Sequence, residues 1–384
     1  MGASPKRASV NAMDLATLAA VAFTLAISIH FVSAAIAAIR CRRKAALTPV
    51  EAGTPAVSLV RPVCGIENSV AETLESAFTL DYPHFELLFC VAQPRDAAIP
   101  LIEKLMRRHP QVRARILIGD DRISGNPKLN NMVKGWHGAK HDLVIFADSN
   151  VLMPRDYIQT LLARWDEKTG LVCAPPAASN PITWSAEIEA AFLNSYQARW
   201  QYCADTLGVG FAQGKNLLYR RDILEAGGGI AALARETAED AASTKLIRGL
   251  GLKVRLAGPP FAQPLGVRVA RDVWKRQVRW AQLRRASFPL CYTAEIFSTS
   301  LPTIGFAAIA GGFPLALAAA LAWYGAECAL ARVAGWPLTP TMPFAMAARD
   351  LALPAIWIAG WRKTGFVWRG NAMQAEPASA FAAP

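Results

Sequence analysis

The sequence contains little charge and no paired cysteines. Charged residues make up 18% of its 384 residues, whereas hydrophobic residues make up 53%. This balance is too apolar for an ordinary soluble protein and too polar for a pure membrane bundle, so we expect a soluble domain with membrane segments at its ends. The seven cysteines are scattered and never form a Cys-x-x-Cys pair. A disulfide framework is therefore not indicated, and we interpret the cysteines as reduced thiols.

Acidic residues are scarce beside basic ones, which number 41 against 29 and give a net charge of +12. Many basic residues flank hydrophobic segments, which favours contact with anionic lipid headgroups. The sequence has no zinc-finger spacing and no aromatic-rich RNA-binding signature, so a nucleic-acid partner is not expected. The glycine-rich stretch 208–214 misses the spacing of a dinucleotide fingerprint by one residue.

One long uncharged run lies near the N-terminus. Residues 15–39 contain no charged side chain and exceed the length of about 20 residues that a membrane span needs. The basic cluster Arg40-Cys41-Arg42-Arg43-Lys44 follows at once, whereas a cleaved signal peptide would end in small residues. We therefore expect residues 1–44 to hold an uncleaved anchor, with the span over 15–39 and the following chain on the cytoplasmic side.

Two further apolar segments lie toward the C-terminus. Residues 296–326 are uncharged but interrupted by Pro302 and by Gly-Gly-Phe-Pro at 311–314, which predicts either one tilted span or a re-entrant piece followed by a span. Residues 344–361 include Arg349 and Asp350, which are expected to pair or to face protein or water. We therefore expect three spans in all, membrane segments over 296–370, and a tail over 371–384.

Between these ends, residues 55–270 are expected to form one cytoplasmic domain. Short apolar strands are predicted at 57–60, 86–92, 112–118 and 143–147, and helices between them at 69–78, 99–108 and 129–138. This alternation predicts an α/β domain with a mainly parallel sheet. Ligands bind beyond the carboxyl ends of the strands in such sheets. Asp148 directly follows a predicted strand, and Asp96 lies four residues after the end of another.

Asp148 is the stronger candidate of these two aspartates. Asp148-Ser149-Asn150 places two oxygen-bearing side chains one residue apart, and Mg²⁺ and Mn²⁺ prefer oxygen ligands together with substrate phosphates. We therefore expect a divalent cation at Asp148, completed by a donor diphosphate. The alternative for each aspartate is a turn residue or helix cap.

Glu239 and Asp240 precede a helical run at 241–247. One interpretation is that these acids complement the helix dipole in its first turn. The functional interpretation is that Asp240 is a general base that takes the proton from an attacking hydroxyl group.

The segment 271–295 carries a cluster of basic residues and two tryptophans. It predicts an amphipathic helix at the membrane surface. Within it, Arg276 and Arg279 are candidates for neutralising a diphosphate, since guanidinium groups match phosphate oxygens. Trp280 is a candidate apolar wall for a sugar or lipid.

The order of these motifs resembles a known signature. Asp96, Asp148-Ser149, Glu239-Asp240 and Arg276-x-x-Arg279-Trp280 are similar to the D, D, D, (Q/R)xxRW pattern of inverting glycosyltransferases. The stretches 57–65, 80–83, 238–240 and Gly-Asn-Pro-Lys-Leu-Asn-Asn at 125–131 narrow the resemblance to ceramide glucosyltransferases, glycosyltransferase family 21. The similarity runs from the N-terminal anchor to Trp368.

The resemblance implies a GT-A type nucleotide-sugar-binding domain that moves glucose from UDP-glucose to ceramide with inversion. Asp240 would be the base, and Asp148 would lie at the metal, Mg²⁺ or Mn²⁺. The other implied donor-binding residues are Asp96, Asn126, Lys128, Ser149, Glu239, Arg276, Arg279 and Trp280. The alanine- and arginine-rich composition resembles that of bacterial members, which implies the bacterial inner membrane.

Two positions depart from animal members of the family, which have histidine at the position of Gln197 and cysteine at that of Phe211. Other UDP-sugars, such as those of glucuronic acid or galactose, and other acceptors, such as diacylglycerol or hopanoids, therefore remain alternatives. A processive polysaccharide synthase and a non-catalytic membrane scaffold that binds lipid are two further alternatives.

Overall fold

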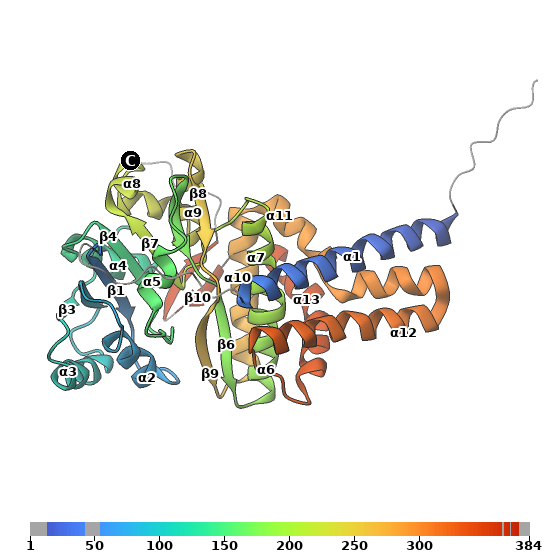
Figure 1. The fold of residues 1–384 in the computed structure, drawn as a ribbon, viewed down its shortest axis with the longest axis horizontal. Helices are drawn as coiled ribbons and strands as arrows, with labels where there is room; N and C mark the ends of the chain where they lie inside the picture. The colour runs from blue at the N-terminus through green and yellow to red at the C-terminus, as the bar shows by residue number, and fades with distance from the viewer. Residues whose placement is uncertain (1–13, 43–53, 363–364, 369, 376–384) are drawn as a thin grey trace, which may run out of the picture.

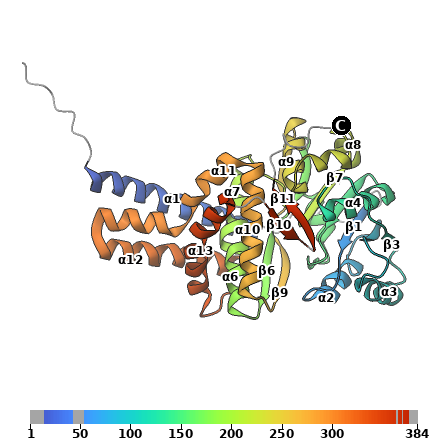
Figure 2. The same ribbon diagram turned by 180° about the vertical axis from the view of Figure 1, so that it is seen from behind.

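The computed structural model describes residues 14–42, 54–362, 365–368 and 370–375. Figure 1 shows a mixed α/β domain at one end of the molecule and long helices that project from the other end. A layer of helices between them runs across the direction of the projecting helices (Figure 2). The predicted architecture, an α/β domain with apolar helices in the N- and C-terminal regions, is confirmed.

The α/β domain is built on a seven-stranded sheet in the order β3-β2-β1-β4-β7-β5-β8. The first four strands in this order are parallel, whereas β7 runs antiparallel to both β4 and β5. The four predicted strands are confirmed with small shifts at their ends, but the sequence pattern does not predict β7. The strands are β1 (Val57–Val63), β2 (Phe85–Val91), β3 (Ala114–Ile118), β4 (Leu143–Ala147), β5 (Thr169–Cys173), β7 (Asn216–Arg220) and β8 (Lys253–Leu256).

Helices cover both faces of this sheet, and the predicted helices are confirmed. The helix that carries Trp136 packs closely on β1, because a Cβ at Gly135 would come within 2.3 Å of a Val60 methyl group. Trp136 and Phe146 belong to the apolar core on this face. The helices are α2 (Val70–Glu75) with η1 (Ser76–Phe78), α3 (Ala98–Arg108), α4 (Pro127–Gly138), α5 (Tyr157–Leu162), α8 (Arg221–Ala226), η3 (Ile230–Arg235) and α9 (Glu239–Gly249).

A middle layer connects the sheet to the projecting helices. The parallel pair β6 (Pro176–Pro181) and β9 (Phe261–Gly266) leads into its two main helices, α6 (Trp184–Ala191) and α10 (Ala270–Ser287). α6 continues through the π-helical segment η2 (Phe192–Ala198) into α7 (Arg199–Thr206), and α10 is followed by α11 (Pro289–Ala294) and η4 (Glu295–Ser298). π-helical turns are rare and often occur at functional sites.

Within the described residues, three helices are long and apolar enough to cross a membrane, namely α1 (Leu15–Arg42), α12 (Ser300–Ala334) and α13 (Met342–Arg362). α12 doubles back at Gly311 and Gly312, where the backbone leaves helical geometry and Gly312 has a φ of +69° (Figure 1). The part before this turn is about 16 Å long, too short for a hydrocarbon core of about 30 Å. The segment is therefore two helical arms rather than one straight helix, and its placement as a re-entrant piece followed by a span stays a prediction.

The C-terminal region differs at its end from the expected membrane segments over 296–370 and tail over 371–384. α13 lies beside α10 and α6 and runs across α1 in the views of Figures 1 and 2. Residues expected to end the membrane segment and begin a tail instead form the antiparallel hairpin β10 (Gly365–Trp368) and β11 (Asn371–Gln374). Residues 376–384 of the expected tail, and Arg43 and Lys44 of the basic cluster, lie outside the described residues.

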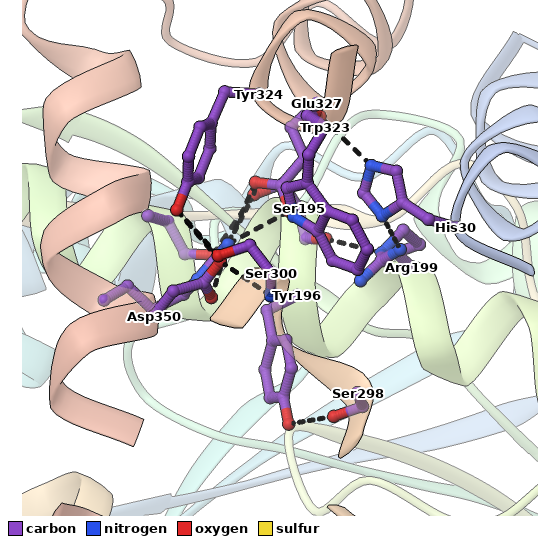
Figure 3. Close-up of polar contacts among 12 residues, drawn as sticks. His30, Ser195, Tyr196, Arg199, Ser298, Ser300, Trp323, Tyr324, Glu327 and Asp350 are labelled. Atoms are coloured by element: carbon purple, nitrogen blue, oxygen red, sulfur yellow. Dashed lines mark hydrogen bonds and ion pairs between the residues drawn. The ribbon is translucent and has the colours of Figure 1, made fainter. Parts of the chain in front are cut away.

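A buried cluster of polar side chains joins the projecting helices to the middle layer (Figure 3). Arg349 of α13 donates two hydrogen bonds of 3.0 Å to Glu327 of α12 and one of 2.9 Å to the adjacent Asp350. Arg199 of α7 donates to Nδ1 of His30 on α1 at 2.7 Å. The side chains of Arg349, Glu327 and Asp350 are fully buried, and the single guanidinium of Arg349 contacts both carboxylates. The expected pairing of Arg349 with Asp350 is confirmed.

Replacing Arg349 with methionine is expected to destabilise the protein by about 3–5 kcal/mol, because two buried carboxylates lose their partner. The measurement is thermal unfolding of the purified protein in detergent micelles. The control is Arg332→Met, which removes an exposed guanidinium from the last turn of α12 and should leave the unfolding temperature nearly unchanged. Equal unfolding temperatures for wild type and Arg349→Met would contradict this account of the cluster.

Candidate active site

Asp148 directly follows β4 and is held between two lysines. Its Oδ1 lies 2.7 Å from Nζ of Lys128, and its Oδ2 lies 2.8 Å from Nζ of Lys215. Burial opposes ionisation, but the two ammonium groups outweigh it and hold the pKa of Asp148 well below its ordinary value. Asp148 is therefore an ionised carboxylate at the edge of the sheet where α/β domains bind ligands.

The loop that carries Asp148 is held in place by β1 and α2. Arg61 of β1 is fully buried and donates to the carbonyl oxygens of Asp148 at 2.8 Å and Val151 at 3.1 Å. Thr73 of α2 donates to the carbonyl oxygen of Ser149 at 2.6 Å. These contacts fix the backbone of the loop within the protein.

Lys128 joins this loop to the segment that carries Glu239. Its Nζ lies 2.7 Å from Oε1 of Glu239 and donates to the carbonyl oxygen of Gly214. Asn126 caps the start of α4, where its side-chain oxygen accepts the N–H of Lys128 at 2.9 Å, and its amide donates to Oε2 of Glu239 at 2.8 Å. The Asn-Pro-Lys motif therefore sets the beginning of α4 and directs Lys128 toward both acids.

Asp240 lies in the first turn of α9 and is half-buried. Its carboxylate accepts the N–H groups of Gly214 at 3.0 Å and Ala241 at 2.8 Å. Burial and the neighbouring Glu239 carboxylate raise the pKa of Asp240 to about 6, although Lys128 and the two N–H donors act in the opposite direction. A carboxylate with this pKa is suited to accept a proton near neutral pH.

These residues form one group, which we call the lysine–acid cluster: Lys128, Asp148, Lys215, Glu239 and Asp240. Gly214 lies next to the side chains of Lys128, Glu239 and Asp240. A Cβ at this position would lie 2.8 Å from Oε1 of Glu239, 3.2 Å from Nζ of Lys128 and 3.3 Å from Oδ2 of Asp240. A side chain here would therefore displace members of the cluster.

Asp96 is placed in the loop after β2. Its two carboxylate oxygens accept the N–H of Gly65 at 3.0 Å each, and Oδ1 also accepts the N–H of Ala98 at 2.8 Å. Asp96 therefore fastens the loop after β1 and stabilises the beginning of α3. Among the described residues, no hydrogen bond or ion pair joins Asp96 to the lysine–acid cluster.

The basic motif lies on α10, where each of its residues has a partner in the protein. Arg276 forms an ion pair with the fully buried Glu189 of α6. The guanidinium of Arg279 lies 5.3 Å from the centroid of the Trp368 ring. Trp280 packs against an apolar cluster between α6 and α13. In the described part of the chain, no ion pair or hydrogen bond joins Arg276 to the lysine–acid cluster.

α10 is nevertheless docked against the segment that precedes Asp240. Ser287 at its end donates to Glu236 at 3.0 Å, and Thr237 donates to the carbonyl oxygen of Gln374 in β11 at 3.0 Å. The hairpin of β10 and β11 lies between α10 and the sheet (Figure 2). The basic helix, the hairpin and the acidic segment therefore pack together beside the cluster.

The two departures from the animal family pattern lie in different places. Gln197 belongs to the π-helical segment η2 and donates to Gln277 of α10 at 3.4 Å, beside Arg276. Phe211 lies three residues before Gly214, and its carbonyl oxygen accepts from the thiol of Cys173 at 3.7 Å. Gln197 thus contacts the basic helix α10, whereas Phe211 is close in sequence to Gly214 and Lys215 at the lysine–acid cluster.

Lys215 is the one member of the cluster that no sequence motif indicates. It reaches Asp148 because β7 pairs antiparallel with β4, with Asn216 opposite Ala147. The one sequence feature that could have indicated its position is an apolar run, Leu217-Leu218-Tyr219, directly after Gly-Lys-Asn. That run is typical of a buried strand, but its direction and neighbour cannot be read from it.

Oxygen ligands for a divalent cation are present at Asp148 and Asn150. Both currently contact Nζ of Lys215, Asp148 Oδ2 at 2.8 Å and Asn150 Oδ1 at 3.1 Å. No group of three His, Cys, Asp or Glu side chains within the described ranges is placed to hold a metal. The pair fits a hard cation by its chemistry, if a donor diphosphate completes the ligands and Lys215 moves away.

Comparison with known proteins gives a family match over most of the chain. The profile of glycosyl transferase family 21 matches residues 25–380. Ceramide glucosyltransferase 1 of Caenorhabditis elegans is 30% identical over 243 residues, which are 63% of this chain and 52% of that protein. Ceramide glucosyltransferase of Komagataella phaffii is 42% identical over 107 residues, 27% of this chain and 21% of that protein. The chain thus spans about half or less of these curated relatives.

Among solved structures, the fold is similar to that of the mannosyltransferase PcManGT from Pyrobaculum calidifontis in complex with GDP-Man and Mn²⁺. The TM-score is 0.54 at 18% sequence identity, and the match covers 91% of this chain and 97% of that chain. This likeness supports the assignment of the sheet domain to the GT-A type.

Replacing Gly214 with alanine is expected to weaken UDP binding by at least about tenfold, or ~1.4 kcal/mol, because the Cβ would displace Lys128 or Glu239. Isothermal titration calorimetry with UDP measures this effect. The control is Gly249→Ala at the end of α9, where a Cβ would meet no atom within 4 Å. Equal UDP affinities in the two variants would show that the close approach at Gly214 is unimportant.

Proposed function

Because the chain belongs to glycosyl transferase family 21, we propose that it transfers glucose from UDP-glucose to the primary hydroxyl of ceramide. The observation that carries this proposal is the lysine–acid cluster, which combines a carboxylate of raised pKa with two ammonium groups at the ligand-binding edge of the sheet. The relatives named ceramide glucosyltransferase support the choice of substrates.

In the proposed reaction, Asp240 is the general base. Its carboxylate takes the proton of the acceptor hydroxyl as that oxygen attacks the anomeric carbon, and UDP leaves from the opposite face, which inverts the configuration. Lys128 and Lys215 neutralise charge that develops on the leaving diphosphate. Glu239 and Asn126 keep Lys128 directed at the site.

The remaining donor-binding roles are part of the same proposal. Asp96 contacts the nucleotide, and Ser149 contacts the diphosphate beside Asp148. Arg276 and Arg279 bind the diphosphate after exchanging their present partners, Glu189 and Trp368. Trp280 borders the sugar or the lipid. The docking of α10 against the segment before Asp240 supports a shared site for these residues.

A divalent cation, Mg²⁺ or Mn²⁺, is also proposed, and it would bind only when Lys215 leaves Asp148 and Asn150. The mannosyltransferase of similar fold is in complex with Mn²⁺, and Asp148 and Asn150 are the residues that would hold a cation here. When bound, such a cation stabilises negative charge on the transferring group as a Lewis acid.

The proposed location is the cytoplasmic face of a membrane, specifically the bacterial inner membrane. Arg40 and Arg42 lie in the last turn of α1, directly before the catalytic domain, and basic residues of this kind remain cytoplasmic. Leu290 of α11 is 86% exposed next to the basic helix. An exposed apolar side chain beside basic ones suits the membrane–water interface, from which a lipid acceptor would enter.

A second candidate keeps the reaction but changes the substrates, because Gln197 and Phe211 differ from the animal family pattern. The donor would then be another UDP-sugar, such as that of glucuronic acid or galactose, and the acceptor diacylglycerol or a hopanoid. A processive polysaccharide synthase would instead release a polymer, and a non-catalytic lipid-binding scaffold would form no product.

The test is transfer of radiolabelled sugar from UDP-glucose to ceramide by the purified full chain in micelles. We expect labelled glucosylceramide from the wild type and none from Asp240→Asn, which preserves the size of the side chain but cannot accept the proton. Unchanged thermal unfolding of the variant shows that its fold is intact. Activity retained in Asp240→Asn would remove this residue as the base, and a different labelled product would identify one of the alternatives.

The pH dependence of transfer follows from the pKa of Asp240. Because the base must be ionised, the rate is expected to rise with pH and to reach half its plateau near pH 6. The measurement is the initial rate at saturating substrates in overlapping buffers. A rate that stays constant from about pH 5 to 7 would contradict the assignment of Asp240 as the base.

A further inference from the structure

The ammonium group of Lys215 lies between the two oxygens best suited to a divalent cation. Its Nζ is 2.8 Å from Oδ2 of Asp148 and 3.1 Å from Oδ1 of Asn150. The side chain is only 13% exposed. An ammonium group and a divalent cation cannot occupy this position together, because they repel each other and need the same oxygens.

The position of Lys215 is set by the backbone. The N–H of Asp148 donates to the carbonyl oxygen of Lys215 at 3.1 Å, which extends the antiparallel pairing of β4 and β7 by one step. The N–H of Lys215 in turn donates to the side chain of Gln213 at 2.8 Å. The backbone is therefore fixed both at Asp148, after β4, and at Lys215, before β7. This places the ammonium group against the carboxylate.

Lys128 reinforces this arrangement on the opposite side of Asp148. It contacts Oδ1 of Asp148 and Oε1 of Glu239, both at 2.7 Å, so Asp148 faces two positive charges while Lys128 is shared with a second carboxylate. Two ammonium groups that can contact a diphosphate are thus already present in the protein.

We propose that Lys215 is the resident cation of the donor-diphosphate site. It competes with a divalent cation for Asp148 and Asn150, and it lets a nucleoside diphosphate bind without metal. The second statement rests on the proposed function, because it assumes a nucleotide donor, whereas the competition with metal does not.

Two measurements on the purified full chain in micelles test this proposal without an activity assay. The first is Mn²⁺ binding, followed by electron paramagnetic resonance of free Mn²⁺ in the absence of nucleotide. Lys215→Met is expected to bind Mn²⁺ on the order of tenfold more tightly than the wild type, since a charge-assisted competitor has been removed.

The second measurement is UDP affinity by calorimetry, with excess EDTA and with saturating Mn²⁺. The wild type should bind UDP in EDTA, whereas Lys215→Met should lose on the order of tenfold in EDTA and recover with Mn²⁺. Lys215→Arg keeps the charge and should retain binding in EDTA. The control is Lys104→Met on α3, an exposed position, which should match the wild type in both measurements.

Equal Mn²⁺ affinities in the wild type and Lys215→Met would overturn the competition. UDP binding by the wild type that requires Mn²⁺ would overturn the role of Lys215 as resident cation for the diphosphate. If no variant binds UDP under any condition while Lys215→Met still tightens Mn²⁺ binding, the competition stands and the proposed UDP-dependent function fails. Thermal unfolding of each variant checks that its fold is retained.

Discussion

The candidate site depends on one half-buried ammonium group, that of Lys128. It contacts a carboxylate after β4, a carboxylate at the start of α9 and the carbonyl oxygen of Gly214, so it joins three segments that are distant in sequence. Removing such a group would leave Asp148 and Glu239 close together with less compensation of their charges. Gly214 leaves room for this group, and Asn126 fixes the start of the helix that carries it. Burial and the Glu239 carboxylate raise the pKa of Asp240, and the ammonium group of Lys128 partly offsets this rise.

A second set of charges has a structural purpose. Arg349, Glu327 and Asp350 are fully buried where α12 and α13 meet the middle layer, and Arg199 extends the polar contacts to His30 of α1 (Figure 3). Charges buried this deeply persist only with partners, so they fix how the apolar helices sit against the domain. The two clusters therefore have different roles: one orients the apolar helices, and the other faces the ligand-binding edge of the sheet.

Sequence patterns predicted much of the fold and part of the site. The spacing of apolar residues along the chain differs between strands and helices. For this reason β1 to β4, α3 and α4 could be predicted. Asp148, Asn126, Lys128, Glu239 and Asp240 follow strands or begin helices, and the structure brings these five together. Lys215 was not predictable, because its contact depends on the antiparallel direction of β7. The ion pair of Arg276 with Glu189 could not be predicted from the sequence either, because Glu189 lies 87 positions earlier on another helix.

The sequence by itself determined the order of the motifs, the α/β class, the apolar helices and the family resemblance, because these properties depend on local periodicity and residue type. Tertiary structure alone decided which charges meet. It placed Lys215 between Asp148 and Asn150, turned α12 back at Gly311 and Gly312, and laid α13 against α10 and α6. The physical reason is that hydrogen bonds and close ion pairs form only at distances of about 3 Å, and such distances between remote segments are set only when the chain packs.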